Sequence, residues 1–557
     1  MPSTSPSSPA DAGTDRLGTG YAPGEAPDSP GWAASAIAWR GVRGAPFAPE
    51  RGLGGRRVGT ALRLALTVAL IYAVHFASNV VRETYLALAL GERGSVRVDE
   101  YLGLHPDLFA IPGRGAYINN NPGASMLAAV PIALARPALA ALFRARPDLA
   151  RPKPAAVYDD PRPNRTKFMN AARARGLDVK LGLAAVVTHV GLMVPLAALA
   201  AVSLFGFLRA RLRDERLALW LALLYAFGTP IFFRSAFLNQ NAIVAHCTLL
   251  AFILLIGASR DDAAGPRALV GAGALLGVAV LCDYSGVPLL ATFGVWTAFR
   301  AWKRAGVSAA AAATLRFALG AAGPLLLLAV YQWAAFGNAL YPAQYYMPPT
   351  PYSVRGWNGI ALPSVELLWR NLFDPRYGLF AFCPMLLAVF ATPLLLRRHS
   401  TDGRPASLLS GAELALAFGA SAALWLFSSA NQFASLQWNT GVRYLVPAAP
   451  LLFAALVPVL LRAGPLTRYL LVAPTVAVSW SVAMAREDVP TSLTHIFVGG
   501  FELPFLTVLR KTASGYAPWL EATGVSPLPI FALVGITLWL LWRGYRAGTE
   551  RSNDGSA

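Results

Sequence analysis

The chain alternates between long apolar runs and short polar connections from about Thr60 to Leu541. A helix needs about 20 mainly apolar residues to cross the hydrocarbon core of a bilayer. The run Thr60–Val80, which follows Arg56 and Arg57, is a clear example. The pattern predicts an all-α, polytopic transmembrane protein with about 12–13 spans. The predicted spans lie near residues 60–80, 182–208, 217–231, 240–258, 268–283, 285–299, 316–335, 377–396, 410–428, 443–462, 466–485 and 529–543.

One further apolar run lies at residues 124–143, and the sequence allows more than one arrangement of it in the bilayer. Arg136 and Pro137 fall in its middle. A central arginine costs roughly 3 kcal/mol on insertion scales, and a proline interrupts the helical hydrogen bonds. The run therefore spans the bilayer, lies flat on it, or forms a bent half-hairpin.

Composition and charge support the membrane class. Hydrophobic residues make up 55% of the chain and charged residues only 14%, against about 25% charged residues in soluble proteins. The net charge of +19 comes from Lys and Arg in short connections between apolar runs. Because such connections fix the orientation of a membrane protein, the charge does not indicate a nucleic-acid partner.

The polar segments divide the chain into three parts. Residues 1–58 are rich in Pro, Ser, Gly and Ala, which predicts a disordered cytoplasmic tail. Residues 59–545 form the transmembrane domain, and residues 546–557 form a short cytoplasmic tail. With both termini inside, the outer loops are residues 81–123, 336–378 and 486–528.

The loop 81–123 contains several side chains that could take part in catalysis or binding. Its carboxylates include Asp99 and Asp107, and it ends in a turn of Asn119–Asn121 before Pro122 and Gly123. A carboxylate at the membrane face can act as a general base toward an acceptor hydroxyl. Several carboxylates can instead hold a divalent cation that screens a phosphate. A solvated loop with helix-capping aspartates remains the plain alternative.

Two charged residues at the ends of apolar runs are further candidates. Arg443 presents a planar five-donor guanidinium that matches two phosphate oxygens, or it reaches outward to water. Asp283, between two runs, marks a site or caps a helix. The aromatic residues of 341–369 suit either a sugar acceptor or an interfacial aromatic belt.

Several short motifs follow one another in a fixed order along residues 60–470. The first outer loop contains Val98-Asp99-Glu100-Tyr101, then Asp107, a Gly-rich turn with Tyr117, and Pro122-Gly123. Later segments continue the series. They are Gly228-Thr229-Pro230 with Ser235 and Gln240-Asn241, Cys282-Asp283-Tyr284, Phe336-Gly337-Asn338, Asp374-Pro375-Arg376-Tyr377-Gly378-Leu379-Phe380 with Pro384, and Gly441-Val442-Arg443-Tyr444-Leu445-Val446-Pro447.

This order resembles that of bacterial membrane glycosyltransferases of the GT-C fold, relatives of the protein O-mannosyltransferases and aminoarabinose transferases. The resemblance implies a GT-C-like domain in the bacterial inner membrane with its active site on the periplasmic side. It also implies transfer of a sugar from a polyprenyl-phosphate donor to an envelope lipid, glycan or protein, with membrane lipids as further partners. A divalent cation is the one cofactor that the resemblance leaves open.

The resemblance also assigns roles to residues. Asp99 is the first candidate for the catalytic base and Asp107 the second. The lipid phosphate and substrate would be bound by Arg443, Tyr444, Asn121, Tyr117 and Asp283. The chain departs from the family at Asn121, where a Lys is frequent, and at Asn241, where a His is frequent.

Two other functions remain open on the sequence. A transporter or lipid flippase without covalent chemistry would place ionisable residues deep within several spans. A non-catalytic relative would account for the departures at Asn121 and Asn241.

Overall fold

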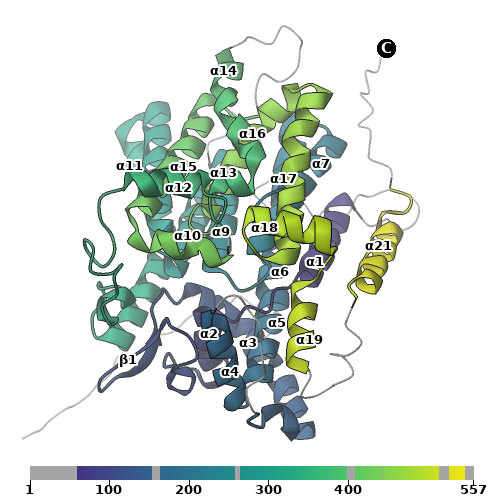
Figure 1. Ribbon diagram of the computed structural model, residues 1–557. Helices are drawn as coiled ribbons and strands as arrows, with labels where there is room; N and C mark the ends of the chain where they lie inside the picture. Colours follow the sequence, from purple (N-terminus) through teal and green to yellow (C-terminus); the bar gives the residue numbers. More distant parts are fainter. Residues whose placement is uncertain are drawn as a thin grey trace, which may run out of the picture. The chain divides into compact units, whose positions relative to one another are not determined.

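The structure is a computed structural model that describes residues 59–153, 163–257, 264–397, 408–440, 442–513 and 526–545. All of them belong to one compact unit. The predicted tails 1–58 and 546–557 lie outside the described residues. The described chain is built almost entirely from helices (Figure 1). The α-helices are α1 (Thr60–Val74), α2 (Arg82–Arg93), α3 (Gly123–Ala145), α4 (Pro163–Ala174), α5 (Asp178–Thr188), α6 (Val194–Leu212), α7 (Glu215–Gly228), α8 (Ile231–Arg234), α9 (Gln240–Ile256), α10 (Pro266–Cys282), α11 (Gly286–Phe336), α12 (Val365–Phe373), α13 (Leu379–Phe382), α14 (Thr392–Arg397), α15 (Gly411–Ala430), α16 (Ala449–Arg462), α17 (Pro465–Ala485), α18 (Val489–Thr494), α19 (Pro504–Ala513) and α21 (Leu528–Trp542).

Shorter elements connect these helices. Two strands, β1 (Leu108–Ile111) and β2 (Gly115–Ile118), form an antiparallel hairpin in which Leu108 lies opposite Ile118. The 3₁₀ and π turns are η1 (Asp99–Tyr101), η2 (Pro147–Ala150), η3 (His189–Met193), η4 (Ala343–Tyr346), η5 (Pro384–Ala391), η6 (Gln432–Thr440), η7 (Val446–Ala448) and η8 (His495–Gly499).

The helices confirm the predicted multi-pass membrane protein. Within the described residues, five helices are long and apolar enough to cross a bilayer by length and composition. Shorter apolar helices occupy most of the other predicted spans. The predicted span 60–80 is helical only to Val74, and the predicted span 377–396 is divided into α13, η5 and α14. The five long helices are Gly123–Ala145, Asp178–Leu212, Gly286–Phe336, Gly411–Ala430 and Pro465–Ala485.

The predicted spans 285–299 and 316–335 fall within the continuous assignment of α11, but they are two separate helices in space. The backbone leaves the helical region at Ala305 and at Gly306, where φ is +79°. A straight helix would separate Gly294 from Phe317 by about 35 Å. Instead, the Phe317 ring lies 3.4 Å from the position of a Cβ on Gly294. The chain therefore folds back at Gly306, whose missing Cβ permits this conformation.

The run whose arrangement the sequence left open is a single helix, α3. It has 23 residues with Pro131 and Pro137 inside it, and its first turns pack against α2. Its length and composition suit a membrane span. The prolines are accommodated within the helix, since they leave it unbroken.

A buried ion pair joins three helix ends on the far side of the bundle from the hairpin. Arg211 in the last turn of α6 binds Glu413 in the first turn of α15 at 3.0 Å, and their side chains are 4% and 1% exposed. Arg211 also donates to the carbonyls of Ile256 and Gly257 at the end of α9. Glu413 completes a capping box with Ser410. The guanidinium thus satisfies the carbonyls that a helix end leaves free.

Candidate functional site

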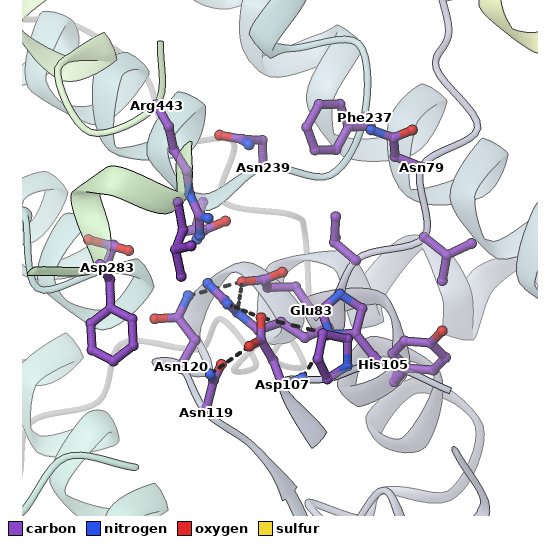
Figure 2. Close-up of a pocket in the computed structure, with 18 of the residues that line it drawn as sticks. Asn79, Glu83, His105, Asp107, Asn119, Asn120, Phe237, Asn239, Asp283 and Arg443 are labelled. Atoms are coloured by element: carbon purple, nitrogen blue, oxygen red, sulfur yellow. Dashed lines mark hydrogen bonds and ion pairs between the residues drawn. The ribbon is translucent and has the colours of Figure 1, made fainter. Parts of the chain in front are cut away.

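A cavity of about 1500 Å³ lies where the first polar segment meets α5, α8, α9 and the loops that follow α10, α11 and α15. Figure 2 shows Glu83, His105, Asp107, Asn119 and Asn120 grouped on one side of it. The side chain of Arg443 extends toward this group from the opposite side. Residues separated by more than three hundred positions thus converge on one space.

Arg82 is the centre of the charged group. Its guanidinium binds Glu83 at 3.0 Å and Asp107 at 2.5 Å. The turn after β2 supplies two amides that complete the arrangement. Asn119 donates to Asp107 at 2.9 Å, and Asn120 donates to Glu83 at 2.9 Å. Both carboxylates therefore have charged and neutral donors, which buried carboxylates require.

The surroundings of Asp107 favour its ionised form. Burial raises the pKa of the Asp107 carboxyl, but the charge of Arg82 opposes this effect, followed by the charge of His105 and the hydrogen bond from Arg82. Together they hold the pKa at about 2. Asp107 is consequently an anion and a hydrogen-bond acceptor at neutral pH.

His105 lies beside this carboxylate in its neutral form. Burial lowers the pKa of His105, and Asp107 partly opposes that shift. The backbone N–H of Asp107 donates to Nδ1 of His105 at 3.1 Å. Since Nδ1 accepts a hydrogen bond, the proton of the neutral ring is on Nε2. His105 is therefore a neutral ring that carries its proton on Nε2.

Arg443 lines the cavity with amide partners. Its Nε donates to Asn241 at 3.2 Å, and its guanidinium stacks 5.3 Å from the ring centre of Tyr444. Gln240, with its amide oxygen turned toward the donors, accepts from Arg443 at 2.8 Å. Within the described part of the chain, no carboxylate lies within ion-pair distance of Arg443. These amides orient the guanidinium without forming an ion pair with it, although the charges of Arg443 and Asp107 still interact at longer range.

The segment that carries Arg443 is held by a single side chain. Oε1 of Gln437 accepts from the backbone N–H groups of Arg443 and Tyr444 at 3.1 and 3.2 Å. Its Nε2 donates to Asn371 at 2.8 Å. The backbone at Arg443 is therefore fixed even though this segment has no regular secondary structure.

A second arginine of the cavity, Arg234, ends α8 and is 1% exposed. It packs 5.3 Å from the ring centre of Phe237. Burial and the charges of Arg443 and Arg486 lower the pKa of Arg234. Arg234 therefore places a second guanidinium in the cavity lining, and the charge of Arg443 acts on it.

The structure brings four of the seven predicted site residues to the cavity. Asp107, Arg443, Tyr444 and Asp283 line it. Oδ1 of Asp283 also accepts from the backbone N–H of Ser285 at 2.9 Å. The carboxylate of Asp283 therefore stabilises the turn between α10 and α11 rather than capping α11, and the residue also lines the cavity.

The other three predicted residues are absent from the described lining of the cavity. Asp99 accepts from the backbone N–H of Ala116 at 2.7 Å and binds Arg97 at 2.9 Å, so it joins η1 to the hairpin. Tyr117 donates to the carbonyl of Arg114. Asn121 donates to the carbonyl of Val280 at 2.7 Å and thereby attaches the turn to α10.

Many lining residues were not predicted as site residues from the sequence, among them Arg82, Glu83 and Gln240. Arg82 and Glu83 begin α2, and Gln240 begins α9. The sequence signal that could have identified Arg82 and Glu83 is an Arg-Glu pair directly after an apolar run. Gln240 contacts the site only through tertiary structure, because its partners Arg82, Asn120 and Arg443 are distant in sequence.

The donor set around Arg82 does not fit a divalent cation. Glu83 and Asp107, its two carboxylates, are already bound by the guanidinium. Elsewhere in the described residues, no group of three or more His, Cys, Asp or Glu side chains has an arrangement suited to a metal ion.

No protein-family model and no curated protein matches this chain. Two solved structures of ArnT from Cupriavidus metallidurans are similar to it, one bound to undecaprenyl phosphate and one in the apo state. Each has 16% sequence identity to this chain and a TM-score of 0.42. The matches cover 86% of this chain and 75% or 74% of the ArnT chains. ArnT is an aminoarabinose transferase of the GT-C fold, a class that the sequence motifs resemble.

Proposed function

We propose that this chain is a membrane glycosyltransferase that moves a sugar from a polyprenyl-phosphate donor to an acceptor in the cell envelope. The observation that carries the proposal is the guanidinium of Arg443, which lines the cavity and has amides rather than carboxylates as its hydrogen-bond partners. A planar guanidinium binds two phosphate oxygens at once. Arg234, on which the charge of Arg443 acts, is a second guanidinium in the cavity lining.

The cavity also has an apolar side that suits a prenyl chain. The residues on this side are Phe168 and Met169 of α4, Leu181 and Leu183 of α5, and Val508 of α19. The ring of Phe168 stacks on His105 with 6.3 Å between centroids, so this apolar side adjoins the charged group. A lipid with an anionic head and an apolar tail matches that juxtaposition.

The proposed reaction is a displacement at the anomeric carbon. The acceptor oxygen forms a bond to this carbon while the bond between the carbon and the phosphate oxygen breaks. Asp107 accepts a hydrogen bond from the acceptor hydroxyl and orients it. A carboxylate with a pKa of about 2 is a weak base, whereas a phosphate monoester has a second pKa of about 6. The acceptor proton therefore passes to the departing polyprenyl phosphate, which Arg443 stabilises.

This mechanism gives the first role to Asp107 and none to Asp99. Asp107 lies in the cavity beside Arg82, whereas Asp99 is bound to Arg97 and the hairpin. The two aspartates therefore form a matched pair for mutation, since Asp107→Asn should lower transfer and Asp99→Asn should retain it.

The decisive experiment measures donor binding and sugar transfer with the purified chain in lipid nanodiscs. Radiolabelled polyprenyl-phosphate sugars serve as donors and an envelope extract serves as acceptor. Arg443→Gln should weaken donor binding about 10- to 100-fold, the range for a lost charge-assisted hydrogen bond. Arg146→Gln is the control, because Arg146 is 59% exposed and pairs with Asp148 outside the cavity lining. Folded protein that binds no polyprenyl-phosphate sugar, or an Arg443 variant with wild-type binding, would contradict the proposal.

A further inference from the structure

One wall of the cavity differs in chemistry from the charged group and from the apolar side. It is formed by residues between Leu340 and Leu436, and every described lining residue in that range is uncharged. All the charged lining residues lie outside that range. We call this surface the neutral wall. Its polar and aromatic members include Gln344, Thr350, Tyr352, Trp357, Asn358, Asn431 and Phe433.

Backbone hydrogen bonds and close packing hold the aromatic part of the neutral wall in place. The loop around Trp357 is joined to the segment after α15 by backbone bonds from Ala361 to Ala430 and from Gln432 to Gly359, at 3.0 and 2.8 Å. The ring of Phe433 packs against Gly359, where a Cβ would lie 2.5 Å from a ring carbon. Gly359 also has a φ of +85°, so the close approach and the turn both require glycine.

The rings offer flat apolar faces next to hydrogen-bonding groups. Tyr352 and Phe433 have their ring centroids 5.8 Å apart, and Trp357 remains 58% exposed. Asn358 and Asn431 line the same wall, and the Nδ2 atom of Asn358 is buried. Oδ1 of Asn431 accepts from the backbone N–H of Phe433 at 3.0 Å, which leaves its N–H₂ group as a donor. Aromatic faces pack against the C–H faces of sugar rings, and amides bind hydroxyl groups.

The neutral wall is attached to the proposed reaction centre at two points. Gln344 donates to the carbonyl of Asn119 at 2.7 Å, and Asn119 donates to Asp107. On the other side, η6 carries Gln437, which holds the backbone of Arg443. A ring bound on the wall therefore lies beside the residues that would orient its hydroxyl and bind the donor phosphate.

We propose that the acceptor is an uncharged carbohydrate whose sugar rings bind to the neutral wall at Tyr352, Trp357 and Asn431. This inference rests on the proposed function and adds the chemical class of the second substrate. The absence of charged lining residues between Leu340 and Leu436, within the described chain, argues against a phosphorylated or acidic group at this position. A protein or lipid acceptor would need no row of rings and amides beside the reaction centre.

The test is a binding screen with the full chain in nanodiscs against an array of neutral and acidic oligosaccharides. Trp357→Leu should weaken binding of the neutral oligosaccharides about tenfold, the effect of losing one aromatic stacking contact of about 1.4 kcal/mol. Trp369→Leu is the matched control. Trp369 is 63% exposed, packs on Phe373 in α12, and is absent from the described cavity lining.

Three results would overturn the inference. Equal binding of neutral oligosaccharides by the Trp357 and Trp369 variants would show that the neutral wall does not bind the sugar. Preferred binding of acidic oligosaccharides would contradict the neutral chemistry. A chain that binds no oligosaccharide but still binds polyprenyl phosphate through Arg443 would exclude a carbohydrate acceptor and leave the proposed function intact. Loss of polyprenyl-phosphate binding itself is measured separately, so the two failures are distinct.

Discussion

The ion pair between Arg82 and Asp107 allows a prediction about stability as a function of pH. Asp107 contacts Arg82 at 2.5 Å, accepts from Asn119 at 2.9 Å, and has a side chain 28% exposed. The Asp107→Asn substitution keeps the shape of the side chain and removes its charge. Arg82 keeps Glu83 as a partner in the variant, so the guanidinium is not left without a carboxylate.

The pKa of Asp107 sets the size of the effect. The value falls from 3.8 for an unperturbed aspartate to about 2 in the folded chain. Each pKa unit corresponds to about 1.4 kcal/mol, so the ionised carboxylate contributes about 2 kcal/mol to the free energy of unfolding. Because the folded pKa is the lower one, this contribution is fully present above about pH 4. It is lost as the pH falls through 2, where the folded carboxylate takes up its proton.

The assay is unfolding of the purified chain in mixed micelles with increasing dodecyl sulfate, at several pH values between 7 and 2. The wild type should exceed Asp107→Asn by about 2 kcal/mol at pH 7, and the difference should shrink toward zero near pH 2. Asp148→Asn serves as a control, since its ion pair with Arg146 is at the surface and surface pairs contribute little. A difference between wild type and Asp107→Asn that stays constant from pH 7 to pH 2 would refute the reasoning.

Two further predictions concern the helices that support the cavity. Glu413→Gln should lower the free energy of unfolding by about 3 kcal/mol, because it leaves the charge of Arg211 buried without its partner. Glu366→Gln, at a site 71% exposed, should change it far less in the same micelle titration. Gly123→Ala should destabilise by about 1–3 kcal/mol and weaken donor binding, because its Cβ would lie 2.6 Å from the backbone of α10. Gly535→Ala has open space around its Cβ and should leave both measurements unchanged, whereas equal effects of the two alanines would contradict the packing argument.

The helices were predictable because apolar length is a local property of the sequence. Most runs that matched the bilayer thickness became helices, although the run 377–396 is divided into α13, η5 and α14. The charged connection 300–316 gave the position at which the chain reverses near Gly306. The hairpin of β1 and β2 was not predicted. Its eight strand residues are too few to show a clear alternation, and its register depends on the glycine-rich turn between the strands.

The candidate site was predictable where a charged residue interrupts an apolar run. Arg443 and Asp283 could be singled out in this way, because a charge at the end of a span needs a specific partner or ligand. Asp99 and Asp107 could not be ranked by sequence. They are only eight residues apart in the sequence. In the structure Asp99 lies beside Ala116 of β2, whereas Asp107 lies beside Arg82. Asn121 was assigned to phosphate binding, but its amide attaches the turn to α10.

Arg82 and Arg443 have different roles in the cavity because their hydrogen-bond partners differ in charge. Arg82 is bound by two carboxylates, so its charge is neutralised and its contribution is to hold Glu83 and Asp107 in place. Arg443 is bound by Asn241 and Gln240, which orient a guanidinium without reducing its charge. An amide-held arginine retains its electrostatic attraction for an anion, whereas an arginine between two carboxylates does not. The cavity therefore separates the residue that builds the site from the residue that would bind the phosphate.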